Sequence, residues 1–437
     1  MSRLVNFIPL HKIKIMKRTL ILSAFPLLFI LLFFAPVTMA QMTGQSISIQ
    51  PGYTNQSFYS LSNGELVNTS NTNWDIAFQL RGMKASILIN SKNNVRLWKA
   101  NKSISQWSSM TVADTTGILS NPVYELFNSD TSWDFGAFNR TNDASNVFDL
   151  GWGVYDFISH AVTGDSVFFI KIGASDFRKI QIESLIGGTY SFRWANLDGS
   201  NEISTTLSKA NYAGKYFVYF SLVNNVAIDR EPLFNTWDLT FCQYQAIFPV
   251  SYKVVGVLSN DSVLMAKAYP VDVNTASASG LAFEEEINTI GYDWKSFDLG
   301  TNSWIIADSL VYFVADRQGN IWKMIFTGFG GASTGVYNFE KGPAATTGLL
   351  ENSSIRTFGI YPNPARDHAR LILDNPLSGD AQLMLIDQSG RVTRSEEIRL
   401  SSGLQSIDLS LEGCKPGLYQ VVIQSGPDRQ ISRLMVH

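Results

Sequence analysis

The chain has 437 residues, of which 45% are hydrophobic, 12% aromatic and 16% charged, and its formal net charge is −3. These apolar side chains are ample for a large packed core, and the sequence lacks the basic blocks with which proteins bind nucleic acid. The only cysteines, Cys242 and Cys414, form no CxxC motif and lie in different predicted domains, so we expect neither a cysteine metal site nor a disulfide between them.

Residues 1–40 predict a secretory signal peptide. They carry five basic residues and no acidic one, followed by an apolar run from Leu20 to Pro36 and a small residue, Ala40. A basic region, an apolar region and a small residue at the cleavage site are typical of such leaders. An uncleaved membrane anchor is the alternative, although Pro26 and Pro36 interrupt the apolar run. Cleavage after Ala40 removes five positive charges and changes the formal charge from −3 to −8.

Residues 41–340 predict a large all-β domain, a β-sandwich or sheet. Short runs rich in Val, Ile, Phe and Tyr are bounded by Gly, Asn, Asp and Ser, which is typical of strands and turns. Asp176–Leu185 fits neither the helical nor the strand period, and both remain open for it. The clearest predicted strands are Val167–Ile172, Tyr216–Leu222, Val254–Leu258 and Leu310–Val314.

Trp-Asp dipeptides occur three times in this region, and two of them lie in similar segments, TNWDIAF and NTWDLTF. The dipeptides begin at Trp74, Trp133 and Trp237 and are therefore 59 and 104 residues apart, whereas a β-propeller repeats about every 40–45 residues. We interpret each dipeptide as a buried Trp whose neighbouring Asp caps a turn. A second weak repeat, Asp-Ser before an apolar residue, occurs at Asp165–Val167, Asp261–Val263 and Asp308–Leu310.

Six segments follow one another in a fixed order: NTNWDIAF, GWGVYDFISHAVTGDSVFFIKI, TWDLTFCQY, YKVVGVLSNDSVLMAKAY, IGYDWKSFDL and LVYFVADRQGNIWKMIFTGF. This ordered set resembles the HmuY-like family of haem-binding surface proteins, from Trp74 to about Phe339. The resemblance implies an all-β fold, haem as the cofactor, two axial side chains on its iron, and an outer-membrane haem receptor as a partner.

The histidines limit how this chain could hold haem. His11 lies in the predicted leader, and His368 and His437 lie near the C-terminus, so only His160 remains in the central region. Imidazole is a good axial ligand for haem iron, and the resemblance makes His160 the candidate ligand. A lone His is more often a surface or packed residue, which is the alternative role for His160.

The second axial ligand is where the chain departs from the family pattern. Family members place a histidine shortly after the second Trp-Asp motif, where this sequence reads CQYQAIF. Tyr244 and Met265 are weak candidates, followed by Met110 and Met83, because Tyr and Met can also bind haem iron. Each of them could instead pack in a core. The competing hypothesis is a non-enzymatic surface adhesin or structural module of the same fold that has lost haem ligation.

Enzyme motifs are weak in this sequence. One central histidine cannot build a multi-histidine zinc site, and a Ser-His-Asp triad would need His160 without a GxSxG elbow. Glu284–Glu286 could supply carboxylates to a glycosidase, but adjacent glutamates usually form a solvated face. We therefore predict that the protein is not an enzyme.

Residues 341–354 have the small, polar, Pro- and Gly-containing composition of a linker. Residues 355–437 then alternate apolar and polar side chains again, which predicts a small Ig-like β-sandwich. Leu383 and Leu385 belong to one alternating run, and Tyr419, Val421 and Ile423 to another.

The segment FGIYPNPA (Phe358–Ala365) opens this region, and GLYQVVIQSGPDRQISRLMVH closes it. The pair resembles the C-terminal sorting domain of type IX secretion substrates, over Ile355–His437. The resemblance implies that the chain crosses the outer membrane through the type IX secretion machinery. We therefore expect a secreted protein or one displayed on the cell surface.

Overall fold

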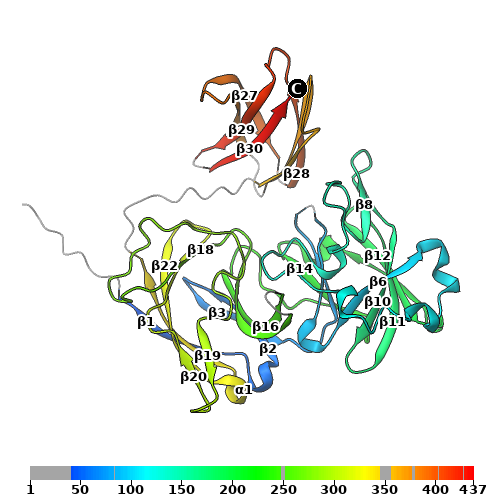
Figure 1. Ribbon diagram of the computed structural model, residues 1–437, viewed down its shortest axis with the longest axis vertical. Helices are drawn as coiled ribbons and strands as arrows, with labels where there is room; N and C mark the ends of the chain where they lie inside the picture. Colours follow the sequence, from blue (N-terminus) through cyan, green and yellow to red (C-terminus); the bar gives the residue numbers. More distant parts are fainter. Residues whose placement is uncertain are drawn as a thin grey trace, which may run out of the picture. The chain divides into compact units, whose positions relative to one another are not determined.

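The computed structural model of the protein describes residues 41–82, 84–247, 251–344, 356–375, 379–401, 403–426 and 428–437. The predicted signal peptide, Met83 and most of the predicted linker lie outside these ranges. Within them the regular secondary structure is mostly β-strand (Figure 1), so the all-β prediction is confirmed. The segment Asp176–Leu185, for which the sequence favours neither helix nor strand, lies in a strand. No helix in these ranges is long and apolar enough to span a membrane.

Helical structure in the described residues is confined to short turns between strands. The one α-helix among them is α1 (Gly331–Thr334). The 3-10 turns are η1 (Pro51–Tyr53), η2 (Ser91–Asn93), η3 (Ile104–Ser109), η4 (Val112–Thr115), η5 (Pro122–Tyr124), η6 (Ala137–Asn139) and η7 (Lys209–Tyr212).

The first lobe of the central region is a sandwich of two sheets. The larger sheet has the order β13-β12-β11-β10-β6-β7, with the hairpin of β8 and β9 attached to β11, and the smaller has the order β15-β14-β4-β5. Phe78, Phe168 and Val218, from both sheets, meet in one apolar core. The strands are β4 (Ile76–Gln79), β5 (Ile87–Ile89), β6 (Arg96–Ser103), β7 (Glu125–Leu126), β8 (Gly153–Asp156), β9 (Ala161–Gly164), β10 (Ser166–Ile172), β11 (Asp176–Ile186), β12 (Thr189–Asn196), β13 (Ile203–Ser208), β14 (Phe217–Ser221) and β15 (Val226–Ile228).

The second lobe is also a two-sheet sandwich, so the predicted β-sandwich occurs twice. Its sheets have the orders β1-β23-β22-β21-β18 and β17-β16-β2-β3, and β19 and β20 form a separate hairpin. Tyr59, Phe241 and Tyr312 meet in its core. The strands are β1 (Thr43–Ser48), β2 (Asn55–Ser60), β3 (Gly64–Ser70), β16 (Leu239–Ala246), β17 (Tyr252–Ser259), β18 (Leu264–Ala268), β19 (Lys295–Asp298), β20 (Ser303–Ile306), β21 (Val311–Ala315), β22 (Ile321–Phe329) and β23 (Val336–Pro343).

The two lobes share strand order and register, so the central region contains an internal duplication. The order β13-β12-β11-β10-β6 in the first lobe corresponds to β1-β23-β22-β21-β18 in the second, and β15-β14-β4-β5 corresponds to β3-β2-β16-β17. Phe220 pairs with Ile76 in the first lobe. At the equivalent place in the second lobe, Tyr59 pairs with Leu239.

Each lobe is built mainly from one copy of the duplicated unit and includes three strands of the other copy. In chain order, β1–β12 form the first copy and β13–β23 form the second. β1–β3 nevertheless complete the sheets of the second lobe, and β13–β15 complete those of the first. The chain therefore crosses between the lobes twice, after β3 and after β15.

A Trp-Asp dipeptide follows each crossing. The tryptophans of Trp74-Asp75 and Trp237-Asp238 are buried, with 6% and 2% of their surface exposed. The Asp75 carboxylate accepts the backbone N–H of Leu222 at 2.7 Å, and the Asp238 carboxylate accepts that of Leu61 at 2.7 Å. The interpretation as a buried Trp with a turn-capping Asp is confirmed for these two dipeptides, and each Asp caps a turn that the other copy contributes.

The C-terminal region is a separate small sandwich, as predicted. Its sheets have the orders β24-β25-β28 and β27-β26-β29-β30, and side chains from both sheets form its core. Its strands are β24 (Arg356–Tyr361), β25 (His368–Asn375), β26 (Gly379–Ile386), β27 (Val392–Leu400), β28 (Gly403–Ser410), β29 (Gly417–Ser425) and β30 (Asp428–Val436). The expected linker start at Lys341 needs correction, because β23 continues to Pro343 through ladder pairs with β1 and β22.

Candidate functional site

His160 lies on the exposed turn between β8 and β9 of the first lobe. Its φ of 54° is left-handed, and the Asp156 carboxylate accepts the backbone N–H of Ser159 at 2.7 Å and thereby holds the turn. The imidazole Nδ1 lies 2.8 Å from the Tyr155 hydroxyl. The rings of Tyr155 and Phe157 lie 6.3 and 5.9 Å from the imidazole, centroid to centroid. His160 is therefore an oriented imidazole at the surface, beside aromatic rings.

Of the predicted second ligands, those that the structure describes do not accompany His160. Met265 lies on β18 with 0% of its surface exposed, inside the core of the second lobe, and Met110 is buried in a small cluster of the first lobe. Tyr244 lies on β16, where burial raises the pKa of its phenol well above the usual value, so it stays protonated. The structure does not bring Tyr244 or Met265 together with His160, because both belong to the packing of the second lobe.

The acidic run Glu284–Glu286 is exposed, in keeping with a solvated face. Among the residues that the structure describes, no group of three or more His, Cys, Asp and Glu side chains could hold a metal ion. Cys242 and Cys414 are both free thiols.

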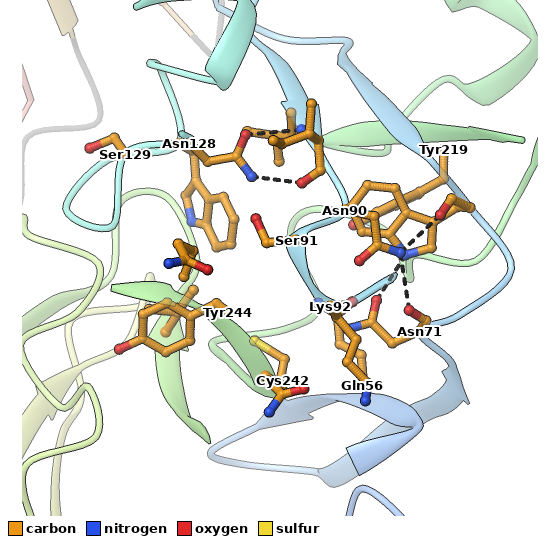
Figure 2. A pocket seen from close by; sticks show the side chains of 17 residues that line it. Gln56, Asn71, Asn90, Ser91, Lys92, Asn128, Ser129, Tyr219, Cys242 and Tyr244 are labelled. Carbon is orange, nitrogen blue, oxygen red and sulfur yellow. Dashed lines mark hydrogen bonds between the residues drawn. The ribbon is translucent and has the colours of Figure 1, made fainter. Parts of the chain in front are cut away.

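A pocket that the sequence did not predict lies where the two lobes meet, between β16 and the η2 turn (Figure 2), and we call it the interlobe pocket. Its volume is about 70 Å³, room for several water molecules at about 10–15 Å³ each and too little for the four pyrrole rings of haem. Seventeen side chains line it: Gln56, Asn71, Trp74, Leu88, Ile89, Asn90, Ser91, Lys92, Asn128, Ser129, Trp133, Tyr219, Cys242, Gln243, Tyr244, Gln245 and Leu258.

The lining of the interlobe pocket combines apolar side chains with amides and hydroxyls and is nearly uncharged. None of the seventeen side chains is a carboxylate, and the one cation, Lys92, donates to the backbone carbonyl of Gly52 at 2.7 Å. Burial raises the pKa of the Cys242 thiol to about 12, so it remains neutral. The hydroxyls of Ser91 and Tyr244 are buried and form no hydrogen bond with the described residues. A buried hydroxyl without a partner is costly, so such groups often mark places where a ligand or water binds.

The third Trp-Asp dipeptide contributes one wall of this pocket. Trp133 donates its indole N–H to the backbone carbonyl of Ser259 at 2.8 Å, and Asp134 accepts from the Gln79 amide at 2.9 Å. Trp133 therefore bridges from a first-lobe loop to a second-lobe strand with its ring held in one orientation. Figure 2 shows Ser91 on one wall of the pocket and Cys242 and Tyr244 on the facing wall.

Comparison with known protein families identifies the C-terminal region. Residues 359–437 match the family model of the secretion system C-terminal sorting domain. This finding agrees with the resemblance of the YPNPA-containing region and with its sandwich fold. The protein is therefore secreted or attached to the cell surface, and its C-terminal domain interacts with the type IX secretion machinery.

No curated protein matches the chain. Among solved structures, it is similar to a biofilm-associated protein, BSP domain, with 9% identity over 90% of this chain and 83% of that one, at a TM-score of 0.17. It is also similar to Escherichia coli alpha-2-macroglobulin activated by porcine elastase, with 8% identity over 91% of this chain and 44% of that one, at a TM-score of 0.17. Such low TM-scores carry no argument about fold or function, and the HmuY-like resemblance stays a prediction.

Proposed function

We propose that the mature protein is an exported binding protein, an adhesin or structural module of the cell surface or medium, without catalytic activity. The match of residues 359–437 to the sorting-domain family is the observation that supports a location at the cell surface or in the medium. The duplicated two-lobed scaffold supports a binding role, because its interlobe pocket is closed by side chains of both lobes and lined by neutral groups.

Three buried carboxylates bond the polypeptide chain itself, which fits a structural and not a catalytic role for them. Glu231 is 2% exposed and accepts the backbone N–H groups of Tyr216 and Phe217 at 2.8 and 3.2 Å. Asp75 and Asp238 likewise accept backbone N–H groups at the lobe crossings. A catalytic carboxylate must reach a substrate, whereas these three are occupied in holding the polypeptide chain.

Haem binding is a second candidate, favoured by the geometry at His160. Its Nδ1 is held by Tyr155, an arrangement that orients an imidazole ligand, while Nε2 forms no hydrogen bond with the described residues. Neighbouring aromatic rings would contact the flat face of a porphyrin. These residues fit a single axial ligand at the surface. No second ligand accompanies it among the residues that the structure describes, so such a complex would be weaker than a doubly ligated one. An outer-membrane haem receptor would then be the partner.

A titration of the purified mature chain with haem, followed at the Soret band, tests the two candidates. If His160 is the ligand, binding saturates, and His160→Ala shifts the Soret maximum and lowers affinity at least tenfold, about 1.4 kcal/mol. His368→Ala, in the sorting domain, is the matched control and should leave the titration unchanged. Absence of saturable binding would exclude haem as the ligand and favour the adhesin or structural role. Repeated chemical turnover of any bound ligand would contradict the non-enzymatic proposal.

A further inference from the structure

We propose that the interlobe pocket binds one neutral sugar ring of a saccharide. The site rests on the proposed binding function and names the class of ligand that its lining fits. Trp133, Trp74 and Tyr219 supply aromatic surface, Leu88 and Leu258 supply aliphatic surface, and the remaining lining is mostly amides and hydroxyls. A pocket with apolar walls and a few directed polar groups is the usual form of a small-molecule site.

The internal duplication relates two positions of this pocket to positions in the other copy. Asn90 donates its side-chain amide to the backbone carbonyl of Asn71 at 3.0 Å, and Asn260 donates in the same way to Phe234 at 2.8 Å. Position 71 is therefore equivalent to position 234, and the common register makes Gln56 equivalent to Phe217.

Large side chains occupy the equivalent positions in the other copy. The Phe234 ring carries the guanidinium groups of Arg81 and Arg317 at 4.4 and 3.7 Å from its centroid. It also stacks on Tyr216, at 5.2 Å between centroids. With Gln56 and Asn71 in place of two phenylalanines, the space beside β16 is open, and these two residues add amide groups to its walls.

The charges of the pocket select a neutral ligand. No carboxylate lines it to attract a cation, and Lys92 is already bonded to a backbone carbonyl. The Ser91 hydroxyl is the group best placed to bond a ligand hydroxyl, since it is buried without a protein partner. A sugar ring combines C–H faces that pack on an indole with hydroxyls that bond amides and serine, and a pocket of about 70 Å³ takes one edge of such a ring at the end or branch of a glycan.

Saturation-transfer NMR and calorimetry on the mature chain test this site, with glucose, galactose, mannose, N-acetylglucosamine and their neutral oligomers as probes. We expect saturable binding of at least one probe. Ser91→Val keeps the shape of the side chain and removes its hydroxyl, and it should weaken that binding at least fivefold, about 1 kcal/mol. Ser204→Val, the same change on an exposed position of β13, is the matched control and should not alter binding.

Asn71→Phe gives an independent test that uses the residue of the other copy. It should fill the pocket and abolish binding while the protein stays folded, because Phe234 occupies the equivalent place. Asn71 accepts the indole N–H of Trp74 at 2.8 Å, and the substitution removes this acceptor. The equivalent Trp237 has no hydrogen-bond partner for its indole N–H among the described residues, so the fold tolerates this loss. A cooperative thermal transition confirms that this variant is folded.

The outcomes distinguish a failure of the sugar site from a failure of the proposed function. Failure of every neutral probe to bind, tighter binding of glucuronate than of glucose, or unchanged binding in both variants would overturn the sugar site and leave the proposed function standing. Release of new reducing ends from an oligosaccharide would show catalysis and overturn the proposed function itself.

Discussion

Asp75 and Asp238 perform the same task in the two lobes, since each carboxylate caps a turn of the other copy beside a buried tryptophan. The pKa of the Asp238 carboxyl group is raised from 3.8 to about 6. Burial is the main cause, the Asp316 carboxylate acts in the same direction, and the N–H of Leu61 and the guanidinium of Arg317 act in the opposite direction.

The raised pKa predicts that ionised Asp238 lowers stability. Because the pKa is higher in the folded state, the carboxyl group contributes stability below about pH 4, and this contribution is lost as the pH rises through about 6. Asp238→Asn keeps an oxygen for the Leu61 N–H and cannot ionise. The free energy of unfolding of the variant, relative to wild type, should therefore rise by about 2–3 kcal/mol between pH 4 and pH 7.

Chemical denaturation at the two pH values measures this difference, and pH effects of other groups cancel in the comparison. Asp308→Asn, at an exposed position, serves as the control and should show almost no such change. An equal effect of Asp238→Asn at both pH values would show that the carboxyl group does not titrate differently in the folded and unfolded chains.

At the level of strands, exchange between the two copies has a direct consequence for folding. The first lobe is continuous in sequence, from β4 to β15, whereas the second lobe needs β1–β3 from the beginning of the mature chain. We expect a fragment of residues 71–231 to unfold cooperatively by itself, since both of its sheets and its core are complete.

A fragment of residues 232–344 should not fold alone, because β16 and β23 would present unpaired edges to solvent. A peptide of residues 41–70 should restore its structure when added in trans, as seen by circular dichroism and NMR dispersion. Cooperative folding of residues 232–344 without that peptide would contradict the exchange of strands.

Much of the strand content could be predicted from composition and alternation. The four clearest predicted strands fall in β10, β14, β17 and β21, because Val, Ile, Phe and Tyr between turn residues are sufficient to indicate a strand. The Asp-Ser repeats occur at the starts of the equivalent strands β10 and β21, and the repeated Trp-Asp segments follow the two crossings between the lobes. Pairings between distant segments, such as β1 with β23, leave no local signal, so the duplication with exchanged strands could not be predicted.

The candidate site was harder to predict for the same reason. Tyr244 drew attention as a possible iron ligand, but its neighbours in the interlobe pocket come from many separate segments of both lobes. The lone histidine pointed to the β8–β9 turn without showing that this turn is exposed. Residue type suggested a chemistry, and only the tertiary structure showed which side chains share a site.

For the whole molecule, the central claim is that the last domain exports the binding region that precedes it. The match of residues 359–437 to the sorting family and the independent core of this sandwich both support an export signal carried by a domain with a core of its own. Export then depends on this domain, while the pocket and the His160 turn belong to the part that is delivered.

The most direct test is to delete Ile355–His437 in the native host and to measure the protein in periplasm, cell surface and medium by immunoblotting. The account predicts that the truncated chain accumulates in the periplasm in a folded, protease-resistant form, while the full-length chain reaches the surface or the medium. Truncated chain at the surface or in the medium at the full-length level would contradict it.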